Sequence, residues 1–422
     1  MINNNIMPLE GLADPHALVE GEFVYIFCGS DKTPRTEDTW RMDKWCILAS
    51  NNLKDWKIIG EILPQDTYMG NDTENCWAGY ILKKDNRYYW FFSNKNINIG
   101  VVVAERVEGP YVDILRKPLI PEGFVDVPCY DPCVYSEDGT YTMFFGAGKY
   151  YCVELTGDLL GIAREPQYVQ VLDEYGKEVR VDDKCTVFKY KNKYYLYYGD
   201  TYAMSEKLKG PYFLAGRFVG GGHNDVFFWK NKWYVCNEFH ETGIFYRGIR
   251  VQELHFDENG KVLISSNDTG DIQQSKQWDF SRNNQNWFLT NDQDLIEGAD
   301  GVVFGLTSQI GMRSPVFPGV FLRGNTYMKI CYRWKGVKSK VLLKIEWVDG
   351  KGEYWKKTPC EKVISFEVIE SGEYQKMKVK LSEKEGILRK ITLIGEDKTH
   401  GIINIKMVSV GQKRVKGECI TW

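Results

Sequence analysis

The sequence predicts an all-β protein in which a five-bladed β-propeller is followed by an antiparallel β-sandwich of the jelly-roll type. One short aromatic pattern occurs five times before residue 260, helical periodicity is scarce, and the character of the chain changes near residue 260. A chain of 422 residues is also longer than one average domain. We therefore expect a propeller domain at residues 1–265 and a sandwich domain at residues 266–422.

The repeated pattern is a Gly or Asn in a turn, followed by alternating aromatic and aliphatic residues. Such a run is typical of the second strand of a β-hairpin with one buried face, and a shorter apolar stretch before each run supplies the first strand. A small sheet of this kind cannot bury both faces alone, so the repeats must pack radially. The runs are GEFVYIF (21–27), NRYYWFF (86–92), GTYTMFF (139–145), NKYYLYY (192–198) and NKWYVCN (231–237).

After residue 278 the hairpin pattern disappears, and seven or eight more ordinary strands follow without a helical signal. This predicts the antiparallel sandwich. Two roles remain open for it: sugar binding through exposed Trp and Tyr side chains, or packing support for the propeller, which we favour.

Composition narrows the function. The net charge is -3, without a basic stripe along the sequence, so nucleic acid is not an expected partner. No apolar run is long enough to span a bilayer and the first residues lack signal-peptide features, so a protein that starts at Met1 would be cytoplasmic. The eleven cysteines are scattered, which indicates reduced thiols rather than disulfides or zinc. These patterns do not predict an oligomeric state.

An acidic residue recurs just before the innermost strand of four repeats: Asp14, Asp131, Asp183 and Asp225. In a radial fold such positions converge near the axis. Glycosidic bonds are hydrolysed by two carboxyl groups, one protonating the leaving oxygen and one activating water. Crowded carboxylates raise one another's pKa, which keeps an acid protonated near neutral pH. Asp-Pro pairs alone are common turn openers, but their equivalent places in the repeats favour a shared site.

Residues 8–262 resemble glycoside hydrolase family 43, five-bladed propeller enzymes that act on arabinose- and xylose-containing glycans. The resemblance rests on LADPHALVEGEFVYIFCGSD, on CWAGYILKKDNRYYWFFS with Gly79 where the family usually has Pro, and on YDPCVYSEDGTYTMFFG. It implies that Asp14 is the general base and that Asp131 orients the general acid and tunes its pKa.

Two further motifs carry the same resemblance. GGGHNDVFFWKNKWYV implies that His223 faces the central channel, beside a calcium ion or water. YRGIRVQELHFDENGK implies that Arg247 reaches the sugar site.

The fourth repeat departs from the family pattern. Relatives carry Glu-Gly-Pro, with the glutamate as general acid, whereas this chain has Asp183, Lys184 and Cys185 at those places. Aspartate is shorter by one methylene, about 1.5 Å, which a backbone shift could absorb or which could abolish protonation. A nearby Lys184 would lower the pKa of the acid. The open alternatives for the acid are Asp182, Glu74, Glu238 or none.

Three other residues have weaker claims to the site. His16 could hydrogen-bond a sugar or be structural, and Trp77 could stack on a sugar or pack between blades. We do not expect His240 to line the site.

The predicted function is an inverting glycosidase of the α-L-arabinofuranosidase or β-xylosidase type, acting on short oligosaccharides of arabinose and xylose. One alternative is a carbohydrate-binding propeller that has lost its acid. Another is a fructan-cleaving glycosidase of the same architecture, although the Asn-Asp-Pro opening and Glu-Cys acid motif of those enzymes are absent from the chain.

Overall fold

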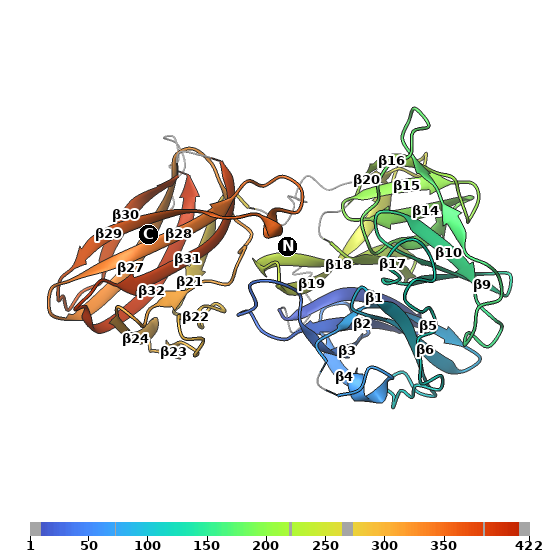
Figure 1. The fold of residues 1–422 in the computed structure, drawn as a ribbon, viewed down its shortest axis with the longest axis horizontal. Helices are drawn as coiled ribbons and strands as arrows, with labels where there is room; N and C mark the ends of the chain where they lie inside the picture. Colours follow the sequence, from blue (N-terminus) through green and yellow to red (C-terminus); the bar gives the residue numbers. More distant parts are fainter. Residues whose placement is uncertain (1–9, 72, 219–221, 264–272, 383–384, 413–422) are drawn as a thin grey trace. The chain divides into compact units, whose positions relative to one another are not determined.

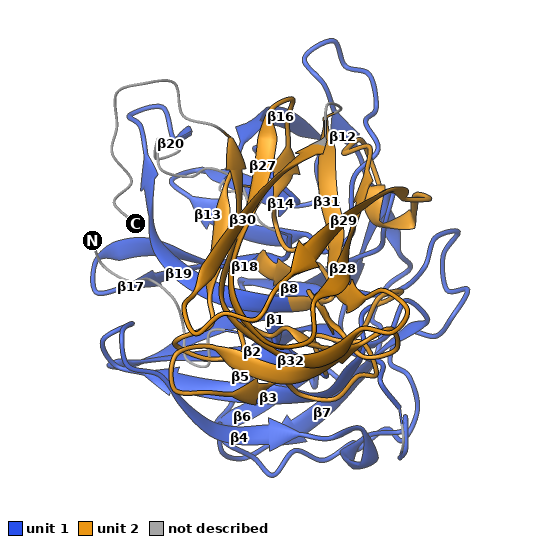
Figure 2. Ribbon diagram, turned by 90° about the vertical axis from the view of Figure 1, so that its left-hand side faces the viewer, with its two compact units in different colours: residues 1–32, 40–239, 247–270 blue, residues 33–39, 240–246, 271–422 orange. Residues whose placement is uncertain are grey.

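The computed structural model describes residues 10–71, 73–218, 222–263, 273–382 and 385–412. The chain forms two compact units (Figure 2): unit 1 comprises residues 1–32, 40–239 and 247–270, and unit 2 comprises 33–39, 240–246 and 271–422. The predicted all-β class is confirmed, because the helical elements among these residues are two short 3-10 turns, η1 (Pro64–Asp66) and η2 (Tyr354–Lys356). Neither turn is long and apolar enough to cross a membrane.

Unit 1 contains five sheets, each built on one of the predicted antiparallel hairpins (Figure 1). Each is named from its innermost strand outward. The first has β1 (Leu12–Glu20), β2 (Phe23–Asp31), β3 (Met42–Ser50) and β4 (Lys57–Ile62), and the second has β5 (Cys76–Lys84), β6 (Arg87–Asn94) and β7 (Asn98–Ala104). The third has β8 (Cys133–Glu137), β9 (Thr140–Phe145), β10 (Tyr150–Glu154) and β11 (Gln167–Val169).

The fourth and fifth sheets complete the propeller. The fourth has β13 (Thr186–Tyr190), β14 (Lys193–Tyr198), β15 (Thr201–Ser205) and β16 (Tyr212–Arg217), with β12 (Val171–Leu172) parallel to β16 at its edge. The fifth has β17 (Asn224–Trp229), β18 (Lys232–Gly243), β19 (Tyr246–Phe256) and β20 (Val262–Leu263).

The innermost strands close a ring. Strand β1 contacts β5 and β17, β8 contacts β5 and β13, and β13 contacts β17. The five-bladed propeller is therefore confirmed, and segments far apart in the sequence meet at its axis.

The aromatic residues of the hairpins fill the space between blades. Phe27 and Trp45 of the first blade pack against Trp90 of the second, and all three are fully buried. Burying a large apolar side chain contributes about 1.5–3 kcal/mol. The aromatic runs thus hold neighbouring blades together as well as each hairpin.

Unit 2 consists of two six-stranded sheets, as predicted for a sandwich. One has the order β23 (Ile296–Glu297), β24 (Val302–Thr307), β32 (His400–Gln412), β27 (Thr326–Gly336) and β30 (Gln375–Ser382), with β21 (Lys276–Asp279) also pairing β32. The other has the order β22 (Phe288–Leu289), β25 (Met312–Arg313), β31 (Gly386–Gly395), β28 (Ser339–Val348) and β29 (Cys360–Val368), with β26 (Phe321–Leu322) pairing β31.

A single apolar core lies within unit 2 and draws side chains from both sheets. Trp278, Trp287 and Trp334 belong to this core and are almost completely buried. These three tryptophans therefore stabilise the sandwich and are not exposed platforms for a sugar.

The cysteines behave as expected from their scattered positions. The ten cysteines within the described ranges are free thiols; nine are buried and Cys360 is exposed.

Candidate active site

Three of the predicted aspartates converge on one histidine. Nδ1 of His223 lies 2.6 Å from Oδ1 of Asp14, and Nε2 lies 3.3 Å from Oδ1 of Asp183 and 3.5 Å from Oδ2 of Asp131. Each residue stands at, or just before, the innermost strand of a different blade. The closed ring of inner strands therefore brings together residues that are more than 200 positions apart.

The two Asp-Pro aspartates share an unusual backbone. Asp14 has φ 54° and Asp131 has φ 56°, in the left-handed region that residues other than Gly rarely adopt. The pairing of β1 with β2 is also irregular between Ala13 and His16, which re-aims the side chain at Asp14. Strained backbone at equivalent points of two blades is typical of functional positions.

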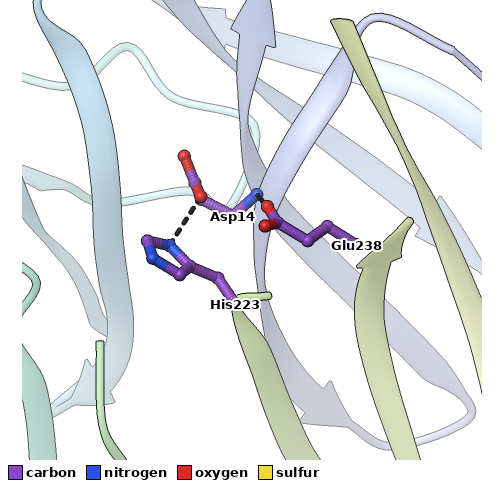
Figure 3. Close-up of side chains that lie close together, drawn as sticks. All are labelled: Asp14, His223 and Glu238. Carbon is purple, nitrogen blue, oxygen red and sulfur yellow. Dashed lines mark hydrogen bonds and ion pairs between the residues drawn. The ribbon is translucent and has the colours of Figure 1, made fainter. Parts of the chain in front are cut away.

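Asp14 is held from behind by Arg247. Nη1 of Arg247 lies 3.0 Å from Oδ1 of Asp14 and 3.0 Å from Oε2 of Glu238, while Nη2 lies 2.9 Å from Oδ1 of Asp31. The Asp14 backbone N–H also points to Glu238, at 3.4 Å, so that Asp14 lies between His223 and Glu238 (Figure 3). The Arg247 side chain is buried and donates to these carboxylates, and its reach to the sugar stays a prediction.

Asp131 is buried and receives hydrogen bonds from its surroundings. The Lys184 backbone N–H donates to its Oδ2 at 3.2 Å, and the Ser93 hydroxyl donates to its Oδ1 at 3.4 Å. Burial raises the pKa of Asp131 to about 7; the positive charge of His223 opposes this rise, and the carboxylates of Asp183 and Asp14 add to it. Asp131 therefore holds a proton more readily than an ordinary aspartate does.

Asp183 is the most accessible of the three carboxyls, with a side chain 42% exposed against 1% for Asp14 and 1% for Asp131. The Tyr130 hydroxyl donates to its Oδ2 at 3.2 Å. Burial acts to raise its pKa, but the hydrogen bond and charge of His223 and the bond from Tyr130 outweigh it and lower the pKa below the ordinary value. While His223 lies here, Asp183 is ionised at neutral pH.

His223 carries the opposite charge. Burial acts to lower its pKa, but the carboxylates of Asp14 and Asp131, and the hydrogen bonds to Asp14 and Asp183, raise it well above the ordinary value of 6.5. At neutral pH the ring is an imidazolium that neutralises part of the cluster.

Comparison with known proteins identifies the propeller. The family model for glycosyl hydrolases family 43 matches residues 3–262. The chain belongs to this family. The match gives no support to the fructan-cleaving alternative.

Curated relatives and solved structures agree with this assignment. The chain is 25% identical over 348 residues to an arabinoxylan arabinofuranohydrolase of Paenibacillus polymyxa, covering 66% of this chain and 54% of that enzyme. It is 29% identical over 245 residues to a β-xylosidase of Xylanibacter ruminicola, covering 45% of this chain and 74% of that enzyme. The chain thus spans about half of the length of the Paenibacillus enzyme.

Among solved structures, RS223-β-xylosidase has a TM-score of 0.55 at 22% identity and covers 62% of this chain and 97% of its own. The arabinoxylan arabinofuranohydrolase of Bacillus subtilis, in complex with cellotetraose, has a TM-score of 0.52 at 17% identity and covers 95% and 96%. At these identities the likeness concerns the fold.

Lys184 stands where family 43 relatives have the glycine of their Glu-Gly-Pro motif. Its backbone is left-handed (φ 23°) and the side chain is buried. Nζ donates to the carbonyl oxygens of Gly79, at 3.0 Å, and Pro132, at 2.9 Å. The ammonium is therefore held by backbone oxygens of the second and third blades, and the amide of the same residue serves Asp131.

The fourth recurring acid does not join the cluster. Asp225 is buried, accepts a hydrogen bond from the Ala17 N–H at 2.8 Å and lies 3.4 Å from Nε2 of His16. Burial raises the pKa of Asp225 to about 7. His16 is 2% exposed, with its ring centroid 3.6 Å from that of Tyr80. This burial is in line with the structural role for His16, and the sugar-binding role stays a prediction.

Glu74, His240 and Asp182 are the remaining candidates. Glu74 forms surface ion pairs with Lys32 and Arg41. His240 belongs to unit 2. Burial raises the pKa of Asp182, and the charge of Asp183 adds to this.

Trp77 keeps both of its predicted roles. It is half-buried and makes an edge-to-face contact with Tyr130 at 6.3 Å between ring centroids, and a similar contact with Trp40 at 6.1 Å. Tyr130 also donates a hydrogen bond to Asp183, so Tyr130 connects the Trp77 ring to the candidate acid.

Sequence patterns did not reveal the supporting residues Asp31, Ser93 and Tyr130. Tyr130 precedes Asp131 directly, which is the one signal that could have suggested it. Asp31 and Ser93 end ordinary strands, and only the closed fold shows that they face the site.

Two groups of side chains have donor atoms close enough to hold a metal ion: Asp14, His223 and Glu238, and Asp131, Asp183 and His223, each within 4.8 Å. Calcium prefers six to eight oxygen ligands. Here Arg247 already binds oxygens of Asp14 and Glu238, and the imidazolium of His223 adjoins the three aspartates. In this arrangement the residues do not fit calcium, because Arg247 and His223 already contact several of the carboxylate oxygens and each candidate group includes a nitrogen of His223 in place of an oxygen ligand.

Proposed function

We propose that the chain is an inverting glycosidase that releases arabinofuranosyl or xylosyl residues from short oligosaccharides. The observation that carries this proposal is the convergence of Asp14, Asp131 and Asp183 on His223. Membership of family 43 supports it, as do relatives named arabinoxylan arabinofuranohydrolase and β-xylosidase.

Asp14 and Asp183 contact opposite nitrogens of one imidazole ring, at 2.6 and 3.3 Å. Their nearest oxygens are therefore no more than about 8 Å apart, a limit that includes both the ~5–5.5 Å of retaining enzymes and part of the ~6.5–9.5 Å range of inverting enzymes. The anomeric configuration of the first product therefore tests the inverting part of the proposal.

In the proposed reaction the substrate first displaces His223 from between these carboxyls, because the ring covers Asp14. Asp14 then takes a proton from the water whose oxygen attacks the anomeric carbon. Asp183 gives its proton to the glycosidic oxygen as the bond from that carbon to the leaving group breaks, and the anomeric configuration is inverted.

The same displacement prepares the acid. Burial and neighbouring carboxylates raise the pKa of Asp183, whereas His223 and Tyr130 lower it. Removing the imidazolium takes away the larger opposing influence, so the pKa of Asp183 rises and the carboxyl gains the proton that it must donate. Arg247 stays paired with Asp14, at 3.0 Å.

The experiment measures hydrolysis of 4-nitrophenyl α-L-arabinofuranoside and β-D-xyloside by the wild type and Asp14→Asn, with the corresponding galactoside for comparison. Asparagine preserves the shape of the side chain but cannot take the proton, so we expect a loss of at least about 100-fold. Proton NMR of the first product should show the inverted anomer. Equal rates in the two proteins would contradict the proposal.

A carbohydrate-binding propeller without activity is the second candidate, and the lowered pKa and short reach of Asp183 favour it. It predicts no hydrolysis by the wild type or Asp183→Glu, together with sugar binding in calorimetry. A large gain of rate in Asp183→Glu would instead indicate an enzyme weakened at its acid.

A further inference from the structure

The outer face of one sheet in unit 2 is strongly cationic. Strands β27 and β30 each have one side toward the core of unit 2 and one side outward. The core side includes Met328, Ile330 and Leu381. The two strands present eight outward positions, at residues 327, 329, 331, 333, 335, 376, 378 and 380. Six of these eight carry a cation and none carries an acid: Lys329, Arg333, Lys335, Lys376, Lys378 and Lys380. We call these six residues the cationic face.

The cations are placed against one another across the strands. Lys329 lies directly opposite Lys378 in the antiparallel register. Like charges in this position destabilise a sheet. Partial burial lowers the pKa of Lys329, and the charges of Lys378 and Lys376 lower it further. The pairing of β27 with β30 therefore holds like charges side by side.

Protection of a sheet edge accounts for only part of the pattern. Lysines on edge strands prevent pairing with other chains, and β30 is the last strand in its sheet among the described residues. Strand β27, however, lies between β30 and β32, and still contributes Lys329, Arg333 and Lys335. An interior strand needs no such protection.

Aromatic rings order some of these cations. Nζ of Lys378 lies 4.4 Å from the ring centroid of Tyr327, and Cζ of Arg333 lies 4.4 Å from that of Tyr374. Asp300 also approaches Arg333, with 3.9 Å between their charged atoms.

We propose that the cationic face binds an anionic glycan, one whose sugars carry uronic acid carboxylates. Alternate residues of a strand are about 6.8 Å apart and neighbouring strands about 4.8 Å apart, so the face offers a two-dimensional array of positive charges to a polymer with repeated carboxylates. Charge-assisted hydrogen bonds from Lys and Arg are the natural contacts. A glycan is favoured over other polyanions because the same chain carries a family 43 propeller, and to that extent the inference rests on the proposed function.

The test measures affinity of the full chain for polygalacturonate and for the same polymer after its carboxyls have been reduced. Asp14→Asn is used as the background, so that binding is read without hydrolysis. We expect binding to the acidic polymer only, weakened by salt. The triple variant Lys376→Gln/Lys378→Gln/Lys380→Gln should bind about tenfold more weakly, since each exposed pair contributes modestly.

The matched control is Lys340→Gln/Lys351→Gln/Lys398→Gln, which removes the same charge from exposed positions of unit 2 outside the face. Its affinity should equal that of the background protein, and thermal unfolding should show both triple variants folded. Equal affinity for the reduced polymer, equal loss in the control, or tighter binding of duplex DNA would each overturn the proposal. Failure of the glycosidase assay leaves this measurement unchanged, because no outcome depends on turnover.

Discussion

The ammonium nitrogen of Lys184 lies 3.0 Å from the carbonyl oxygen of Gly79. These are two positions at which the chain differs from the motifs of family 43, with lysine in place of glycine and glycine in place of proline. A side chain at residue 79 would meet the Phe91 carbonyl and the Trp90 ring, each 2.4 Å from an added Cβ. The two positions are therefore in contact: the backbone of the second blade supplies a carbonyl oxygen that accepts a hydrogen bond from the Lys184 ammonium of the fourth blade.

Lys184→Met should destabilise the propeller. The methionine fills a similar volume but leaves the buried carbonyl oxygens of Gly79 and Pro132 without this donor. A buried group that loses its partner costs about 1–3 kcal/mol. The free energy of unfolding in urea measures the loss, and Lys207→Met, at an exposed position outside the site, is the comparison. An unchanged unfolding midpoint would contradict this role of Lys184.

Asp183→Asn should reduce activity in a way that depends on the leaving group. General acid catalysis contributes about 10²–10⁴-fold, and it matters most when the leaving oxygen is strongly basic. We therefore expect a loss of at least about 100-fold on xylobiose or an arabinose disaccharide and a much smaller loss on 4-nitrophenyl glycosides. Asp182→Asn changes the adjacent carboxyl and should retain activity on both. Equal losses on both substrate types would assign the proton to another group.

His223 should make the free energy of unfolding fall as pH rises above neutral. Its folded-state pKa is raised above its unfolded value, so its contribution is complete below about pH 6.5 and is lost as pH rises through the folded-state pKa. His223→Asn should cost roughly 2 kcal/mol of unfolding free energy at pH 6 and less at higher pH. His255→Asn, at a side chain 61% exposed, provides the matched control. A pH-independent difference between wild type and His223→Asn would refute the charged state.

Asp225 should make the free energy of unfolding fall as pH rises, because burial raises its pKa in the folded state. Its pKa of about 7 in the folded state lies above the ordinary value of 3.8, so between these pH values the folded chain holds a proton that the unfolded chain has released. The contribution of Asp225 to stability therefore falls as pH rises from about 4 to 7. Asp225→Asn keeps an oxygen for the Ala17 N–H and removes this fall. Denaturant unfolding from pH 4 to 8 should show that the unfolding free energy of the variant rises relative to that of the wild type. Parallel curves for the two proteins would contradict the raised pKa of Asp225.

The sequence predicted the five blades and three members of the cluster because both follow from repetition. The alternating aromatic runs mark each hairpin, and equivalent places in the repeats become neighbours at the axis. Asp14, Asp131 and Asp183 could be found in this way, and the fourth repeat's Asp225 shows the limit, since the same placement leads its side chain to His16 instead.

Contacts between non-equivalent positions could not be predicted. Asp31 meets Arg247 across 216 residues, and neither residue belongs to a pattern that points to the other. The cationic face was hidden for a related reason. Its lysines alternate with apolar residues along β30, and only the pairing with β27 reveals how many charges lie together.

The position of His223 between the carboxyls also suggests how the site could be blocked. The imidazolium contacts both the proposed acid and the proposed base, so a cationic ligand that takes its place keeps a positive charge between them. A protonated nitrogen placed in a five- or six-membered sugar ring would reproduce that charge where His223 now supplies it. Nitrogen-containing sugar analogues should therefore compete for this site more strongly than neutral sugars of the same shape.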